Sequence, residues 1–292
     1  MRGYFENRPP ILQLFYFFMA AGFSMLCTHL LLLTVSLLGG MLYHTKITSK
    51  GTLWQDVKMI FPLTTVSVIV NGLVNHRGAT VLFKLFGKPV TQEALLFGLV
   101  TGLSFSAVIV WFLCYSKVFT SEKIMMLFGN KVPTLTLSLT MVLRFVPDLL
   151  QRTKEIVSAQ RGLGVFVTSG SLRERALSGM RILSVVISYA LEGAVQVAAS
   201  MKNRGYGLTG RTSYMKYIYI GSDYVLMVLF AMLFGGMSYA LGVGKFSARF
   251  FPLLSFAQPT VFDMMILILF YSLPFLVDGL QELKWNYLRS KI

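Results

Sequence analysis

The chain has 292 residues, of which 55% are hydrophobic and 13% are charged, and its mean hydropathy is +0.66. An average soluble domain carries about 25% charged residues, so this composition excludes an ordinary soluble fold and indicates an integral membrane protein. Lys and Arg number 27 against 12 Asp and Glu, which gives a net charge of +15. In a membrane protein such an excess is typical of cytoplasmic loops and of contacts with anionic lipid, so we expect the lipid bilayer, and no nucleic acid, as a partner.

Apolar segments predict about six membrane crossings. Residues 11–43 carry no formal charge, and as one helix they would be about 50 Å long against a hydrocarbon core of about 30 Å. We therefore expect two short helices that meet near Thr28 and His29. This apolar run is longer than the ~7–15-residue core of a signal peptide, so we expect it to stay in the mature protein. Single crossings are predicted at residues 59–74, 94–115, 224–243 and 260–277.

Six crossings place both termini on the cytoplasmic side, where a basic C-terminal tail is expected. Other cations then lie on the external side, against the usual bias of Lys and Arg toward the cytoplasm. These cations are Arg77, Lys84, Lys88, Lys245 and Arg249. Asp263 lies near the end of the last predicted span, so we expect it to reach the membrane surface or to pair with a cation.

The middle of the chain differs from the apolar segments. Residues 120–216 hold 13 Lys or Arg and 5 Asp or Glu, and each would cost about 2.5–3.5 kcal/mol inside a bilayer. Apolar residues still recur at helical spacing there, which predicts two long amphipathic helices. Pro133 suits the start of the first helix. Ser171 and Glu174 have the spacing of a capping box, so the second helix is predicted to run from residue 172 to residue 205.

The two predicted helices end in similar short segments. Each combines a small residue, a long uncharged residue, a cation and a glycine, and glycine and cations both favour a helix C-terminus. Two interpretations remain open: ordinary helix caps, or cationic tips that bind acidic grooves on partner proteins. The first tip comprises Ala159, Gln160, Arg161 and Gly164, and the second comprises Ser200, Met201, Lys202, Arg204, Gly205 and Tyr206.

The sequence predicts no catalytic, metal or cofactor site. Residues 205–210 match the dinucleotide pattern GxGxxG, but that pattern needs a preceding strand, and here it follows a predicted helix. The three histidines lack metal-ligand spacing. Cys27 and Cys114 lie in apolar segments and are read as buried hydrophobic residues.

The second tip, continued through residues 205–212, resembles the second coupling-helix motif of the T components of energy-coupling factor (ECF) transporters. Four further segments resemble the same family and occur in its order. They are Asn75-His76-Arg77-Gly78, Thr91-Gln92-Glu93-Ala94, Thr120-Ser121-Glu122-Lys123 and Leu143-Arg144-Phe145-Val146-Pro147.

This resemblance implies an all-α integral membrane protein with about six transmembrane helices and long amphipathic cytoplasmic coupling helices. It implies transmembrane helices in residues 1–118, a coupling-helix region in 119–216, and transmembrane helices with a basic tail in 217–292. The implied partners, in a prokaryotic cytoplasmic membrane, are two ATP-binding cassette ATPases and a substrate-binding S component for vitamin or micronutrient uptake. The chain would not be an enzyme and would bind no cofactor, because ATP and Mg²⁺ would lie on the ATPases.

One departure from the family concerns the first tip. The arginine-glycine pair of the motif is present at Arg204 and Gly205, whereas the first copy has Leu163 before Gly164. Arg161 could supply the missing cation. Two other functions remain open: a self-contained permease, which needs no separate binding subunit, and a membrane-bound enzyme acting on lipids, which needs a convergent acid, base or metal site.

Overall fold

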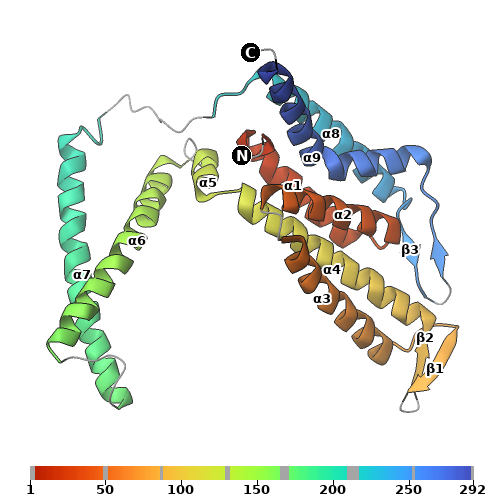
Figure 1. Ribbon diagram of the computed structural model, residues 1–292, viewed down its shortest axis with the longest axis horizontal. Helices are drawn as coiled ribbons and strands as arrows, with labels where there is room; N and C mark the ends of the chain where they lie inside the picture. The colour runs from red at the N-terminus through yellow and green to blue at the C-terminus, as the bar shows by residue number, and fades with distance from the viewer. Residues whose placement is uncertain are drawn as a thin grey trace. The chain divides into compact units, whose positions relative to one another are not determined.

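The computed structural model describes residues 4–48, 52–85, 88–128, 132–164, 171–208, 217–251 and 254–290. Within these ranges the chain is mainly helical and divides into two compact units (Figure 1). Unit 1 comprises Met1–Ile124 and Tyr217–Ile292, and unit 2 comprises Met125–Lys216. Each unit is described by itself below. The functional regions predicted at 1–118, 119–216 and 217–292 stay predictions.

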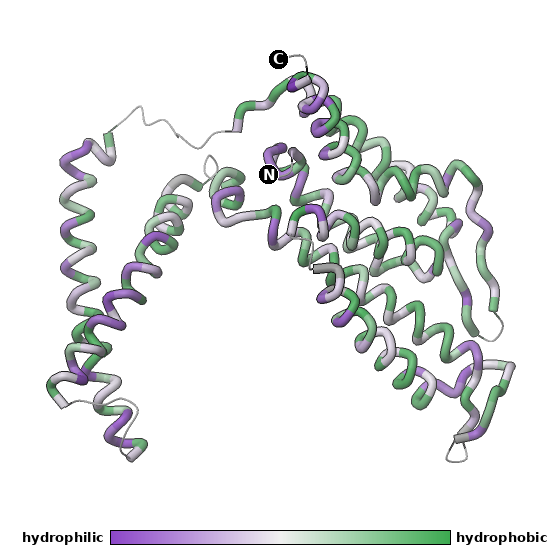
Figure 2. The backbone as a smooth tube through the Cα atoms, viewed as in Figure 1, coloured by the Kyte–Doolittle hydropathy of each residue, from purple (hydrophilic) through white to green (hydrophobic). Residues whose placement is uncertain are grey.

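In its described residues, unit 1 has six long helices, with a short 3-10 helix, η1, before them and two small hairpins between them (Figure 1). Figure 2 shows that these six helices are mostly apolar along their length. Their bounds are α1 Pro10–Leu26, α2 Leu30–Ile47, α3 Thr52–Val74, α4 Gln92–Val118, α8 Gly221–Gly242 and α9 Val261–Arg289, and η1 is Phe5–Asn7.

The predicted break in the first apolar segment is confirmed, because α1 ends at Leu26 and α2 begins at Leu30. The other four predicted spans are all longer in the structure, and the extension is largest in α3 and α9. α3 begins seven residues earlier and contains Pro62, and α9 continues to Arg289, beyond the apolar stretch. Hydropathy locates the part of a helix that lipid surrounds, but a helix continues into water when its backbone hydrogen bonds remain satisfied.

Small residues allow the helices of unit 1 to approach closely. Gly98 and Gly102 lie one turn apart on α4 and face α3: a Cβ at Gly98 would lie 2.8 Å from the Cα of Val68, and one at Gly102 would lie 2.8 Å from the Cα of Thr64. This is the small-xxx-small arrangement of membrane helices, in which contact between backbones supplies the packing energy. Ser24 and Ser36 add a buried hydrogen bond of 2.6 Å between α1 and α2.

One end of unit 1, here called the hairpin end, holds both hairpins. Strands β1 (Val81–Leu85) and β2 (Lys88–Thr91) form the first, and β3 (Ala248–Arg249) and β4 (Ser255–Phe256) form the second. The turn between α1 and α2 lies at the same end, because the amide of Ala248 donates to Thr28 Oγ1 at 3.1 Å. Asp263 pairs there with Lys245 at 3.0 Å, which confirms that it pairs with a cation.

The opposite end of unit 1, here called the terminal end, holds the described start and end of the chain. The amide of Phe5 donates to Asp278 Oδ1 of α9 at 2.6 Å. Lys123, at the start of α5 (Ser121–Phe128), donates to the carbonyl of Glu6 at 2.6 Å. Both connections to unit 2 leave from this end, because one follows the C-terminus of α4 and the other precedes α8.

The described part of unit 2 contains two long helices, α6 (Pro133–Gly162) and α7 (Leu172–Asn203). The predicted capping box of α7 is confirmed: the amide of Glu174 donates to Ser171 Oγ at 3.4 Å, and the amide of Ser171 donates to Glu174 Oε2 at 2.8 Å. The predicted start of α6 at Pro133 is also confirmed.

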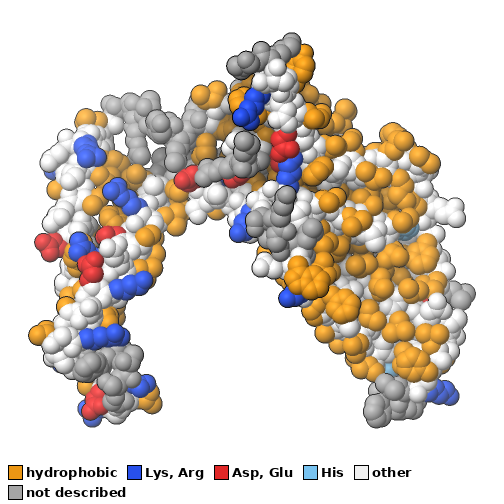
Figure 3. Space-filling model, in the orientation of Figure 1, with side chains coloured by type: hydrophobic (Ala, Val, Ile, Leu, Met, Phe, Trp, Pro, Cys, Tyr) orange, Lys and Arg blue, Asp and Glu red, His pale blue; other side chains and the backbone are white. Residues whose placement is uncertain are grey.

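Among the residues that the structure describes, six helices are long and apolar enough to cross a membrane: α2, α3, α4, α7, α8 and α9. α1, with 17 residues, is slightly shorter. In α7 only the most apolar stretch of 18 residues is hydrophobic enough to cross a membrane. The helix also carries charged residues at both ends and is amphipathic. Figure 3 shows Lys and Arg side chains spaced along unit 2, whereas large areas of unit 1 are hydrophobic.

Candidate functional site

The second predicted tip closes helix α7 with a complete Schellman motif. The amide of Gly205 donates to the carbonyl of Lys202 at 3.0 Å, and the amide of Tyr206 donates to the carbonyl of Met201 at 3.0 Å. Gly205 has φ +80°, a left-handed conformation that glycine adopts without the steric cost of a Cβ. Arg204 is the C-cap residue, so its position is fixed by the end of the helix.

Cations surround this cap. Lys202 and Arg204 are exposed, as are Ser200 and Tyr206, while Met201 and Gly205 are half-buried. The carbonyls at the end of a helix carry a partial negative charge, which favours the two cations in this place. Because the cap already satisfies those carbonyls, the guanidinium of Arg204 can bind a partner without unwinding the helix.

The first predicted tip has a similar geometry at the end of α6. Gly164 has φ +82°, and its amide donates to the carbonyl of Arg161 at 3.1 Å, the first of the two Schellman bonds. Ala159, Arg161 and Gly164 are exposed, while Gln160 is half-buried. The residue at the position of Arg204 is Leu163, which is also exposed. The structure thus gives both helices the same kind of end but only the second a cation at the cap itself.

A polar contact joins α6 to α7 away from the tips, and the sequence did not predict it. Arg152 Nε donates to the hydroxyl of Tyr189 at 3.0 Å, and Arg152 Nη1 pairs with Glu155 at 2.9 Å. The guanidinium also lies 5.1 Å from the centroid of the Tyr189 ring. The hydrogen bonds to Glu155 and Tyr189 raise the pKa of Arg152, so its charge persists.

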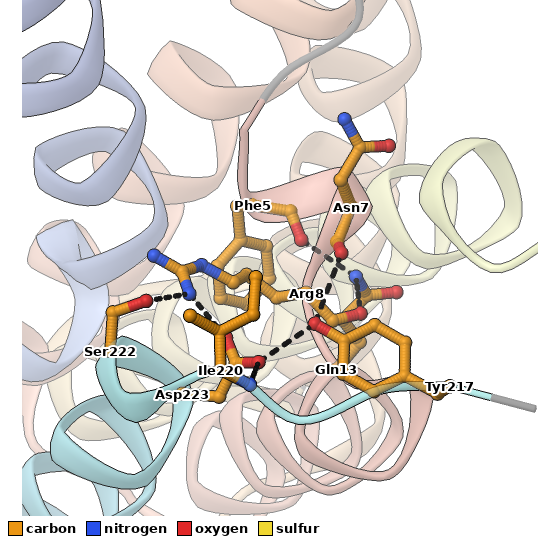
Figure 4. A network of polar contacts seen from close by, with 8 residues as sticks. All are labelled: Phe5, Asn7, Arg8, Gln13, Tyr217, Ile220, Ser222 and Asp223. Atoms are coloured by element: carbon orange, nitrogen blue, oxygen red, sulfur yellow. Dashed lines mark hydrogen bonds and ion pairs between the residues drawn. The ribbon is translucent and has the colours of Figure 1, made fainter.

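A buried network at the terminal end fixes the point at which the chain enters α8 (Figure 4). Arg8 forms an ion pair with Asp223 and donates to Ser222 Oγ at 2.8 Å. Asp223 also accepts from the hydroxyl of Tyr217 and from the amide of Ile220, both at 2.9 Å. Burial and the hydrogen bond to Asp223 raise the pKa of Tyr217, so the phenol remains a donor.

Sequence reasoning missed this network. In the sequence Arg8 is a cation before an apolar segment, and no prediction was made for Asp223. The available signal was an acidic residue in the first turn of an apolar helix, but nothing in the sequence joins it to a partner 215 positions away.

The Asn75–Gly78 and Thr91–Ala94 segments meet at the hairpin end. The carboxylate of Glu93 accepts from the amide of Thr80 at 3.1 Å and from its hydroxyl at 2.8 Å. Gly78 lies against it, and a Cβ there would lie 2.6 Å from Glu93 Oε2. In this chain these residues fold the connection between α3 and β1.

The described residues contain no group of three or more His, Cys, Asp or Glu side chains that could hold a metal ion. Residues 205–208 of the GxGxxG pattern follow α7, while the rest of the pattern lies outside the described residues. An apolar groove of about 450 Å³ lies between α1 and α4, and its lining includes Phe18, Gly22 and Phe112.

Taken together, these features define a class: a multi-pass membrane protein whose helical membrane unit is joined to a second unit of two long, cation-tipped helices. The family of CbiQ cobalt transport proteins matches residues 7–214, which is more than half of the chain. The chain belongs to this family, and it is a transmembrane T component of the ECF transporter type, located in the cell membrane.

Curated relatives carry the same description. The energy-coupling factor transporter transmembrane protein EcfT of Bacillus subtilis is 38% identical over 108 residues, which are 35% of this chain and 41% of that protein. EcfT of Lactobacillus helveticus is 34% identical over 110 residues, which are 37% of this chain and 40% of that protein. EcfT of Acidaminococcus fermentans is 27% identical over 202 residues, which are 63% of this chain and 73% of that protein. The chain thus spans about two fifths of the length of the first two relatives.

Proposed function

We propose that this chain is the non-catalytic subunit that transmits conformational change from two ATP-binding cassette ATPases to a substrate-binding S component in the membrane. ATP and Mg²⁺ bind to the ATPases, and this chain binds no cofactor. The cargo is a vitamin or another micronutrient, and the S component selects it.

The observation that carries this proposal is the pair of capped helix ends in unit 2. Both have a glycine of positive φ that stops the helix cleanly, and both present exposed cations there. An arginine fork can bind a carboxylate through two parallel hydrogen bonds, so an acidic groove on each ATPase is a suitable partner. Because the two tips are similar, each can bind one of two similar ATPase subunits.

The distribution of charge supports a cytoplasmic position for the tips. Residues 120–216 carry 13 Lys or Arg, and both connections to them leave from the terminal end of unit 1. The positive-inside bias therefore favours the terminal end as the cytoplasmic one. ATPases that use cytoplasmic ATP would meet the tips on that side.

The groove between α1 and α4 suits a membrane partner. Its lining is apolar, and Phe18 and Phe112 within that lining are exposed. A Cβ at Gly22 would touch nothing, so a helix of the S component could approach the backbone of α1 there.

The test replaces Arg204 by Glu and measures how well the tagged chain retains the ATPases from a membrane extract. An interface arginine contributes about 2 kcal/mol or more, so the affinity for the ATPases should fall by a factor of about thirty and their retention should drop with it. Arg173→Glu is the matched control, because Arg173 is exposed at the opposite end of the same helix. Arg204→Gln separates the loss of the cation from repulsion by a new carboxylate. Equal retention by the wild type and Arg204→Glu would refute docking at this tip.

Two rival functions give different results. A self-contained permease would transport its cargo with the ATPases and without an S component. A lipid-modifying enzyme would turn over lipid as a purified single chain. Reconstitution of this chain with and without each partner distinguishes all three.

A further inference from the structure

The first hairpin, β1–β2, exposes apolar side chains in three successive positions. Val81, Leu82 and Phe83 are 51%, 56% and 53% exposed. Successive residues of a strand point to opposite faces. A bulge interrupts the pairing between Val81 and Phe83. Even so, three successive apolar residues place apolar groups on both faces of the strand. A partner protein docked on one face would leave the other in water. A surrounding medium that is itself partly apolar would cover both.

The position of the hairpin indicates that this medium is the surface of the lipid bilayer. Only six residues separate the end of α3 from β1, and β2 leads directly into α4. Both helices are long and apolar enough to cross a membrane. A five-residue strand is about 17 Å long, so the hairpin cannot extend far from the point where the two helices leave the hydrocarbon core. Such a short reach would keep the hairpin close to the lipid headgroups.

Cations accompany the apolar side chains. Arg77 and Lys84 are exposed, and no carboxylate partner is recorded for either within the described part of the chain. Lys245, at the same end of unit 1, does pair with Asp263. These cations are among those that run against the positive-inside bias, and the proposed transport function gives them no role.

The hairpin is held in place before any ligand binds. Glu93, at the start of α4, accepts hydrogen bonds from Ala79 and Thr80 just before β1. Gly78 has no room for a Cβ against Glu93 and Thr91. Because the connection is already ordered, binding to a surface costs little additional conformational entropy.

We propose that the β1–β2 hairpin is an interfacial anchor for anionic phospholipid. Val81, Leu82 and Phe83 insert at the boundary between headgroups and acyl chains, and Arg77 and Lys84 bind lipid phosphates in the same leaflet. This inference does not depend on which side of the membrane the hairpin end faces.

The test uses the full chain in bilayers of phosphatidylcholine with or without phosphatidylglycerol. Cys27 and Cys114 are replaced by Ala, and a spin label is attached at Leu82→Cys. Its accessibility to oxygen, which enters lipid, is compared with its accessibility to a water-soluble nickel chelate. Val66→Cys, exposed in the middle of α3, calibrates a lipid position, and Ser290→Cys, exposed at the end of α9, calibrates a position nearer to water.

Four outcomes decide the proposal. We expect the label at position 82 to be more accessible to oxygen than to nickel. The double variant Arg77→Gln/Lys84→Gln should raise the nickel accessibility of this label severalfold in bilayers that contain phosphatidylglycerol, and should leave it unchanged in bilayers of phosphatidylcholine alone. A label as accessible to nickel as that at position 290 in both bilayers would overturn insertion. A label inaccessible to both reagents would show that protein covers the strand, and a double variant without effect would overturn the binding of anionic lipid.

Discussion

Arg152 of α6 and Tyr189 of α7 are joined side chain to side chain, with 3.0 Å between the guanidinium Nε and the phenolic oxygen. This contact lies between the two helices whose ends we propose as ATPase contacts. Replacing Tyr189 by Phe should remove the hydrogen bond and keep the ring under the guanidinium. In a double-mutant cycle with Arg152→Ala, we expect the two effects to couple and not simply to add, as measured by unfolding in detergent.

Lys154→Ala is the control for that cycle, because Lys154 is exposed on the same helix and has no recorded side-chain partner on α7. Its effect should add to that of Tyr189→Phe without coupling. Strict additivity of Arg152→Ala and Tyr189→Phe would mean that the contact contributes nothing to the pairing of α6 and α7.

The ion pair between Arg8 and Asp223 is buried at both partners. Asp223→Ala should leave a buried guanidinium without its carboxylate and lower the free energy of unfolding by about 3–5 kcal/mol. Replacing both residues, as Arg8→Met/Asp223→Leu, should recover much of that loss. Thermal unfolding of the purified chain measures both effects.

The pair of half-buried Lys46 and exposed Glu282, 3.2 Å apart, provides the comparison. Glu282→Ala should change the free energy of unfolding by less than about 1 kcal/mol, because water screens a surface pair. A loss from Asp223→Ala no larger than that of Glu282→Ala would contradict the buried network.

Close contact of α4 with α3 depends on Gly98. In Gly98→Ala the added Cβ would meet backbone atoms of Val68 and Ser67 at 2.8 and 2.9 Å, which a change of rotamer cannot relieve. We expect a loss of about 1–3 kcal/mol, seen as a lower melting temperature. Gly235→Ala in α8, where a Cβ meets nothing within 4 Å, should be neutral or slightly stabilising. The same melting temperature for both variants would argue against backbone contact at Gly98.

The left-handed cap of α7 makes Gly205 sensitive to substitution. Gly205→Ala forces an L-residue to φ near +80° and should destabilise the helix end by about 1–2 kcal/mol. Hydrogen exchange of the last turn of α7 should accelerate accordingly. Gly193→Ala, in the open interior of the same helix, should slow exchange instead. If the tip binds an ATPase, Gly205→Ala should also reduce retention of the ATPase, whereas Gly193→Ala should not.

The sequence determined the features that depend on neighbouring residues. Ser171 and Glu174 predicted the start of α7, Pro133 predicted the start of α6, and the apolar segments predicted the membrane helices and the break between α1 and α2. Caps and hydropathy act within one or two helical turns or along one continuous segment, so their residues are adjacent in the chain. The roles of the tip residues, from Ala159 to Gly164 and from Ser200 to Tyr206, stay predictions.

Only the tertiary structure decided which distant residues meet. It paired Arg8 with Asp223, brought Arg152 to Tyr189, set Gly98 against α3 and formed the two hairpins between the membrane helices. Such contacts depend on how whole helices pack, and many alternative partners have the same local sequence character. The free energy that selects one arrangement is shared among contacts far apart in the chain, so no short segment of the sequence contains it.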